Sequence, residues 1–191
     1  GLYEWQDIDY LWAIQLDDTY MLLECGSSGD CLFSSVAEAL NLNNIYLNKI
    51  TEYCDAETLR KQASSMIDEN NFDIIIETYK LEKEHNEFDG NWDPYTINNI
   101  EELKSEIERL GHNFWGDHIT LQLLALAIKK NFIILKIDLN LDEPICDTNK
   151  IIIDINYEYL ILYFEDNCHF KLVGRFDGSK MNVLFQKIPG E

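Results

Sequence analysis

The apolar residues of the first part of the chain fall into short stretches with helical spacing. Side chains three and four positions apart predict helices over about residues 31–40, 55–69 and 72–80. Polar residues 41–48 are expected to form a loop after the first of these helices. Residues 1–24 mix aromatic and acidic side chains, and they predict either a helix or an extended arm.

The middle of the chain contains one polar stretch and two further helix signals. Residues 84–99 are polar, include a glycine and a proline, and predict an exposed loop. Asn98 followed three residues later by Glu101 resembles a capping box, which would open a helix ending near Gly111. A second capped helix is expected over residues 117–131.

The pattern changes after this helix to short branched and aromatic runs separated by turn residues, which predict strands. These runs are Phe132–Leu139, Ile151–Ile155, Tyr159–Phe164, His169–Gly174 and Val183–Phe185. Helices followed by strands predict an α+β domain, with helices packed around a mostly antiparallel sheet of about five strands. The 191 residues suit one domain that can bury a sizeable core.

The chain carries 35 acidic and 15 basic residues, for a formal net charge of -20. Such a surface repels the phosphates of nucleic acids and anionic lipids, so neither is expected as a partner. It would attract a basic partner, although solubility explains the acidic excess equally well. No run reaches the roughly 18 apolar residues of a membrane span, and no secretory signal is visible. Five cysteines without regular spacing favour reduced thiols and a cytoplasmic location.

One cysteine lies in a setting that suits a nucleophile. The sequence Ser-Gly-Asp-Cys-Leu-Phe begins at Ser28 and places Cys31 on the first turn of a helix. Gly29 permits a tight backbone, and Asp30 is expected to cap the helix. The helix dipole and unpaired backbone N–H groups would favour the thiolate of Cys31. The N–H groups of residues 29–31 could also hold an oxyanion, although most free cysteines are simply core residues.

Of the four histidines, His169 suits a catalytic partner best. It opens a strand directly after a turn, so the sheet would fix its backbone while the ring faces a site. His85 is expected to be solvated, and His112 and His118 to have capping or packing roles. Pairing His169 with Cys31 follows the thiol–imidazole logic of nucleophilic catalysis.

Four motifs, in this order and spacing, resemble those of the OTU (ovarian tumour) family of cysteine proteases, which act on ubiquitin. They are Ser28–Phe33 at the nucleophile, Leu59-Arg60 on a following helix, Trp115-Gly116-Asp117 before an apolar helix, and His169-Phe170 after an apolar strand. The motifs span about residues 20–175, which is nearly the whole chain.

The resemblance implies an OTU-like, papain-type fold and a single catalytic domain over residues 1–191. It implies hydrolysis of isopeptide bonds at the C-terminus of ubiquitin, polyubiquitin or a ubiquitin-like modifier. Cys31 would be the nucleophile and His169 the general base, with Trp115 and Phe170 lining the substrate cleft. The expected protein is a monomer without cofactor or metal, acting in the cytoplasm, or in the host cytoplasm if it is a pathogen or viral effector.

Two residues depart from the family pattern. Ser28 stands at the family's aspartate position, and Lys171 stands where an acid or amide often follows the histidine. Strand alternation places Lys171 on the face of the histidine, where a cation cannot accept a hydrogen bond from the imidazole. Asn167 could act as the third member of the triad, as could Asp17 or Asp18, a backbone carbonyl or a water.

These departures leave two other functions open. A ubiquitin-binding module with little or no turnover is one, because a poorly oriented imidazole impairs catalysis more than binding. A viral-type protease that cleaves its own polyprotein is the other. A zinc site built from Cys25, Cys31, Cys168 and His169 is disfavoured, because the paired short spacings of structural zinc sites are absent.

Overall fold

The computed structural model describes residues 4–26, 28–49, 53–111, 114, 116–138, 140, 143–146, 151–166 and 168–187. The strands within these residues are β1 (Gln6–Asp7), β2 (Tyr20–Leu23), β3 (Asn131–Asp138), β4 (Glu143–Cys146), β5 (Tyr159–Glu165), β6 (His169–Phe176) and β7 (Met181–Asn182). The α-helices are α1 (Tyr10–Gln15), α2 (Cys31–Tyr46), α3 (Ala56–Ser64), α4 (Phe72–Glu84), α5 (Ile100–Glu108) and α6 (His118–Ile128). Two short 3-10 helices are η1 (Ser28–Asp30) and η2 (Pro94–Thr96).

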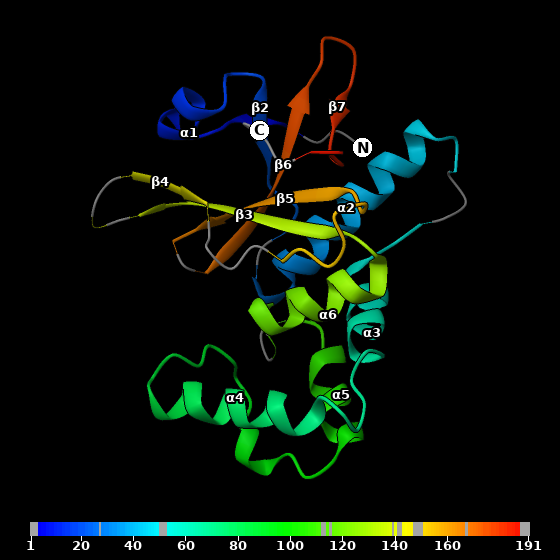
Figure 1. Ribbon diagram of the computed structural model, residues 1–191, viewed down its shortest axis with the longest axis vertical. Helices are drawn as coiled ribbons and strands as arrows, with labels where there is room; N and C mark the ends of the chain where they lie inside the picture. The colour runs from blue at the N-terminus through cyan, green and yellow to red at the C-terminus, as the bar shows by residue number, and fades with distance from the viewer. Residues whose placement is uncertain are drawn as a thin grey trace.

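The described strands form one mixed sheet in the order β1-β2-β6-β5-β3-β4, with β7 paired to β6. β3 and β5 run parallel, whereas β2 and β6, β5 and β6, and β3 and β4 pair antiparallel. The expectation of an α+β fold with a mostly antiparallel sheet is therefore confirmed, although the sheet has more than five strands. Figure 1 shows the sheet twisting between α1 on one side and α3 to α6 on the other.

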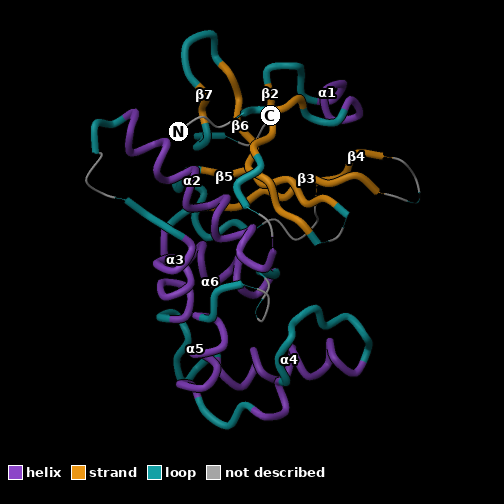
Figure 2. Tube along the Cα trace, turned by 180° about the vertical axis from the view of Figure 1, so that it is seen from behind, coloured by secondary structure: helices purple, strands orange, loops and turns teal. Residues whose placement is uncertain are grey.

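Side chains of the central strands alternate between two cores, one on each face of the sheet. On β5, Leu160 and Leu162 join the larger core, together with buried residues of α2, α3, α5 and α6. Their neighbours Ile161 and Tyr163 face a smaller core, which Trp12 of α1 closes. The view from behind shows the same separation of the helical end from the strands (Figure 2). The sheet is thus buried on both faces, and β6 is held within it between β2 and β5.

α2 is longer than its pattern predicts, because it continues to Tyr46 through residues expected to form a loop. Asn41 explains part of the difference. Its side-chain amide donates to the carbonyl of Cys54 at 2.7 Å and accepts from the Cys54 amide at 2.8 Å. A polar residue that the sequence assigns to a loop therefore ties two distant segments together.

The two later helices begin with side-chain caps, as expected. Asp117 and Thr120 form a capping box at the start of α6. The cap of α5 lies one residue later than predicted: Asn99 accepts from the amide of Glu102 at 2.9 Å. The Glu102 carboxylate in turn accepts from the amide of Asn98 at 2.7 Å.

The stretch 84–99 is only partly the exposed loop that its polarity predicts. Phe88 and Trp92 pack edge-on against the ring of Tyr79, with centroid distances of 5.9 and 5.2 Å. Trp92 also stacks on Phe114 at 5.6 Å. Two aromatic residues within a polar stretch thus hold this segment against the body of the protein.

The strand predicted over residues 151–155 does not form. Ile151 alone bridges to Phe132, and the residues after it are exposed. The side chain of Asn131 shapes this segment as a turn, because it donates to the carbonyl of Asp154 and accepts from the amide of Ile153.

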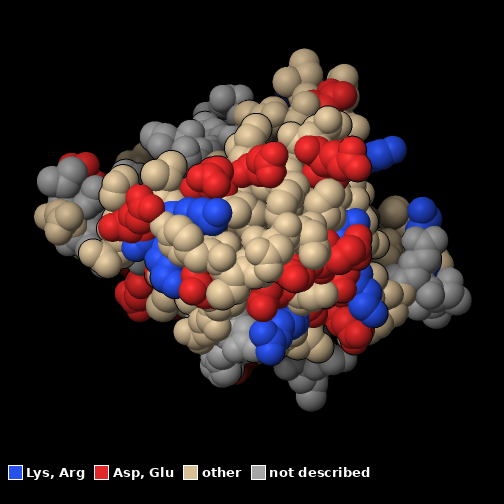
Figure 3. Space-filling view, turned by 90° about the horizontal axis from the view of Figure 1, so that it is seen from below, with Lys and Arg blue, Asp and Glu red and all other residues tan. Residues whose placement is uncertain are grey.

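The face formed by the helical end of the molecule carries acidic and basic side chains in alternation with uncharged ones (Figure 3). Among its exposed pairs are Lys83 with Asp93 at 2.9 Å and Arg109 with Glu106 at 3.3 Å. None of the helices in the described part of the chain is both long and apolar enough to cross a membrane.

Candidate active site

Cys31 lies at the junction of η1 and α2, in the position the sequence predicts. The buried side chains of Leu32, Phe33 and Val36 fix the first turns of α2 in the larger core. Cys31 itself is only 2% exposed. The backbone amide of Phe170 donates a hydrogen bond to its Sγ atom at 3.4 Å. Folding therefore brings the sulfur beside the residue that directly follows His169.

His169 begins β6, and its ring contacts an acid that sequence reasoning missed. The Nε2 atom lies 2.5 Å from Oε1 of Glu24. Glu24 directly follows β2, and the antiparallel register pairs Leu23 with Leu172. The register thus brings Glu24 to the start of β6. The signal for Glu24 is this long-range pairing, which the local pattern does not reveal.

Lys171 lies on the same face as His169, as strand alternation predicts. Its Nζ atom is 3.0 Å from Glu165 and 3.9 Å from the second carboxylate oxygen of Glu24. The cation therefore contacts two carboxylates. These four residues, His169, Glu24, Lys171 and Glu165, are referred to below as the His169 edge.

The other candidates for the third triad position fare differently. Asp17 accepts from the amide of Thr19 at 2.8 Å and lies 3.7 Å from Arg175, near the far end of β6. Asn167 lies outside the described residues, as does Trp115, so their roles remain predictions. The role of Ser28, which begins η1 in the structure, also remains a prediction.

The environment of Cys31 changes the expected state of its thiol. Burial raises the pKa of Cys31, and the nearby Glu24 and Cys168 act in the same direction. Hydrogen bonds from the amides of Phe170 and Leu32 lower the pKa but do not outweigh the loss of solvent. The backbone amides thus favour the thiolate, as expected, but burial outweighs them and the pKa of Cys31 is raised overall.

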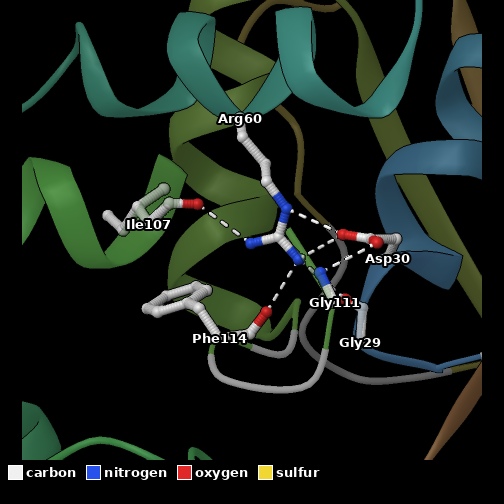
Figure 4. Close-up of polar contacts among 6 residues, drawn as sticks. All are labelled: Gly29, Asp30, Arg60, Ile107, Gly111 and Phe114. Carbon is white, nitrogen blue, oxygen red and sulfur yellow. Dashed lines mark hydrogen bonds and ion pairs between the residues drawn. The ribbon is translucent and has the colours of Figure 1, made fainter. Parts of the chain in front are cut away.

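Asp30 does not cap α2 as predicted, because its carboxylate bonds elsewhere. Oδ1 accepts from Nε and Nη2 of Arg60 at 3.0 and 2.7 Å, and Oδ2 accepts from the Gly111 amide at 2.9 Å. Arg60 also donates to the carbonyls of Gly29 at 3.0 Å, Ile107 at 2.9 Å and Phe114 at 2.8 Å (Figure 4). These contacts are referred to below as the Arg60 clamp.

Gly29 is required by a close approach rather than by a special backbone angle. A Cβ atom at this position would lie 1.9 Å from the carbonyl oxygen of Gly111. The tight backbone expected from the sequence is therefore explained by contact with Gly111, a residue far away in the sequence. This contact and the Arg60 clamp hold the residues just before Cys31.

A cavity of about 490 Å³ is lined in part by Cys168 and Phe170, the two residues that flank His169 in the sequence. Phe170, a predicted cleft residue, lines it together with Phe164, on which its ring stacks at 4.6 Å. Four acidic residues also line the cavity: Glu82, Glu87, Asp89 and Asp117. Burial and the neighbouring carboxylates raise the pKa of Glu82 to about 7.

The cysteines show no metal-binding arrangement within the described structure. The described residues contain no group of three His, Cys, Asp or Glu side chains arranged to hold an ion. The cysteines whose side chains are described, Cys25, Cys31, Cys54 and Cys168, are free thiols. Burial raises the pKa of Cys25 to about 12, so its thiol is neutral at physiological pH.

The comparison with known families decides the relationship that the motifs suggest. A family model described as OTU-like cysteine protease matches residues 26–170. The chain belongs to this family. The matched region contains both Cys31 and His169, as well as Arg60.

Solved structures of OTU proteins share the fold. An OTU deubiquitinase from Wolbachia pipientis wMel is 15% identical, with a TM-score of 0.53 over 85% of this chain and 93% of that one. The same deubiquitinase bound to ubiquitin is 14% identical, with a TM-score of 0.53 over 82% and 96%. An OTU domain in complex with ubiquitin is 11% identical, with a TM-score of 0.51 over 90% and 78%. No curated protein matches the sequence significantly.

Proposed function

We propose that this OTU-family protein is a deubiquitinase that hydrolyses isopeptide bonds at the C-terminus of ubiquitin. The observation that carries the proposal is the junction of Cys31 with the start of β6, where the Phe170 amide donates to Sγ at 3.4 Å. The adjacent imidazole is held by Glu24 at 2.5 Å. The OTU structures solved in complex with ubiquitin support the choice of substrate.

In the proposed reaction, the Nε2 contact with Glu24 leaves Nδ1 of His169 to take the proton from Cys31. The thiolate then attacks the isopeptide carbonyl, and the N–H groups of residues 29–31 stabilise the oxyanion. The imidazolium returns its proton to the departing lysine amine, which leaves a thioester on Cys31. Water, activated by the same ring, hydrolyses the thioester and regenerates the thiol.

The cavity offers a place for the residues before the scissile bond, because it reaches Cys168, the residue that precedes His169. Its acidic lining would favour basic side chains in the ubiquitin tail, and this gives part of the chain's acidic excess a role. Raising the ionic strength should then raise KM. Cleavage whose KM is insensitive to salt would contradict this role for the acids.

Binding without turnover is a second candidate function, favoured by one observation. Cys31 is 2% exposed, and burial raises the pKa of its thiol, which disfavours the nucleophilic thiolate. A chain that binds ubiquitin without aligning thiol and imidazole would act as a binding module. In either case the free thiols support a site of action in the cytoplasm, the host cytoplasm in the case of a pathogen's protein.

The decisive experiment combines hydrolysis of diubiquitin with covalent capture by ubiquitin bearing a thiol-reactive C-terminus. Wild type should cleave diubiquitin and form an adduct at Cys31, located by peptide mass spectrometry. Cys31→Ala should do neither, whereas Cys168→Ser removes an exposed neighbouring thiol and should still be captured. Ubiquitin binding without capture or cleavage would favour the binding module instead.

A further inference from the structure

Arg60 is a fully buried cation that donates hydrogen bonds to the residues just before Cys31, to the end of α5 and to the connection between α5 and α6. Its side chain is 0% exposed, while that of its ion-pair partner Asp30 is 23% exposed. The guanidinium also lies over the ring of Phe33, 4.2 Å from its centroid. Burying a charge this completely is costly unless geometry and hydrogen bonding compensate for the loss of solvent. Five donated hydrogen bonds provide that compensation.

The bond to the carbonyl of Gly29 fixes the direction of the next amide. In a trans peptide the C=O and the following N–H point in opposite directions. The structure contains no cis peptide bond among its described residues. Because Arg60 holds the Gly29 oxygen toward the interior at 3.0 Å, the N–H of Asp30 points the other way, away from the clamp.

The clamp also joins this loop to a wall of the cavity. Arg60 donates to the carbonyl of Phe114, which precedes Gly116 and Asp117, both lining residues. Asp30 reaches the amide of Gly111 in the same connection between α5 and α6. One guanidinium therefore sets the distance between the loop before the nucleophile and the loop that borders the cavity (Figure 4).

We propose that Arg60 is a positioning residue that holds the oxyanion-binding amides of residues 29–31 in their catalytic orientation. The inference rests on the proposed function, since it concerns the transition state of that hydrolysis. A lysine would retain the charge but lacks the planar fork that reaches several acceptors at fixed angles. Arg60 thus acts through the backbone and does not itself touch the substrate.

The test compares two reactions of the same thiol. Hydrolysis of a ubiquitin C-terminal amide develops an oxyanion, whereas alkylation by ubiquitin carrying a C-terminal alkyl bromide does not. In the alkylation, the Cys31 sulfur forms a bond to carbon while bromide leaves. Arg60→Lys should lower kcat for hydrolysis about 10- to 100-fold, with KM within about twofold of wild type. Its alkylation rate should stay within about threefold of wild type, because no oxyanion has to be stabilised.

Two further variants separate positioning from folding. Asp30→Asn removes the ion pair but keeps the size of the side chain and the three carbonyl acceptors of Arg60, so kcat should fall less than in Arg60→Lys. Arg109→Lys changes an exposed arginine that pairs with Glu106, and both reactions should match wild type. Circular dichroism and a melting curve report whether each variant is folded.

The outcomes are distinguishable. Hydrolysis and alkylation that fall together in folded Arg60→Lys, or an unchanged kcat, would overturn the positioning role alone. A wild-type chain that is alkylated by the bromide but hydrolyses no ubiquitin amide would overturn the proposed function and, with it, this inference. A loss of hydrolysis in Arg60→Lys that is larger than in Asp30→Asn, with alkylation retained in both variants, would support the inference.

Discussion

The Arg60 clamp and the His169 edge hold the two halves of the proposed catalytic pair in different ways. At the clamp, a fully buried guanidinium reaches three segments of the chain. At the edge, the Glu24 side chain is 46% exposed and that of His169 is 20% exposed, and the contacts are charged side chains on neighbouring strands. Hydrogen bonds to backbone carbonyls thus hold the loop before the proposed nucleophile, whereas partly exposed charged side chains contact the proposed base.

This difference indicates which of the two regions, the Arg60 clamp or the His169 edge, is sensitive to ionic strength. Salt screens exposed charges over about 8 Å at physiological ionic strength, but it affects buried pairs much less. Ionic conditions should therefore act through the His169 edge and the acidic cavity, while the loop before Cys31 keeps its geometry. Substitutions at the clamp should in turn act through the geometry of this loop and depend little on ionic strength.

The largest expected effect comes from removing His169, the proposed base at the His169 edge. His169→Ala takes away the group that accepts the proton from a thiol whose pKa burial already raises. General-base catalysis contributes about 10²- to 10⁴-fold, so kcat for a ubiquitin amide should fall by about that factor. Turnover is measured by fluorescence release. Replacing His118, a cavity-lining histidine, by alanine serves as the control, and an equal loss there would contradict the assignment.

Gly29→Ala tests the rigidity of the clamp. Its Cβ would lie 1.9 Å from the backbone oxygen of Gly111, so one of the two segments must move. The free energy of unfolding should fall by about 1–3 kcal/mol, measured by urea denaturation. Gly26→Ala is the matched control, because its Cβ would meet only the side chain of Ser34, at 3.3 Å. Equal stability of both variants would show that the loop is pliable.

An effect of intermediate size is expected for Glu82 in the cavity wall. Burial and neighbouring carboxylates raise the pKa of Glu82 to about 7 from an ordinary value of 4.5. Between these values the folded protein holds a proton that the unfolded chain has lost, so stability falls as pH rises through this window. Glu82→Gln should therefore be more stable than wild type at pH 8, by roughly 1 kcal/mol after allowance for solvent screening. At pH 4 the two should melt alike. A difference that is independent of pH would contradict this account.

The smallest effect is expected where both partners are exposed. Lys61 pairs with Glu57 at 3.2 Å on the surface of α3, with side chains 61% and 55% exposed. Lys61→Met should change the free energy of unfolding by less than about 0.5 kcal/mol. A larger loss in thermal melts would mean that surface pairs on the helical end matter more than their exposure suggests.

Features of the site that depend on local sequence could be predicted. The apolar spacing after Cys31 predicts a helix, and Asp117 with Thr120 caps α6, since both signals act within a few residues. The family motifs located Cys31 and His169 in one matched region. The extension of α2 past Asn41 could not be predicted, because it depends on a contact with Cys54.

The contacts that set the chemistry come from distant segments and left no local signal. Glu24 reaches the imidazole only because β2 pairs with β6, a register that pattern alone does not give. The sequence predicts that Asp30 caps a helix, yet its carboxylate accepts hydrogen bonds from Arg60 instead. The raised pKa of Cys31 likewise follows from burial in the assembled core.

The account depends most directly on Glu24 as the acid that orients His169, and kcat for a ubiquitin amide tests it. Glu24→Gln keeps the shape but removes the charge, and it should lower kcat about 10- to 100-fold with KM little changed. Asp17→Asn, in the same N-terminal segment but bonded to Thr19, should stay within about twofold of wild type. Full activity in Glu24→Gln together with loss in Asp17→Asn would contradict the account.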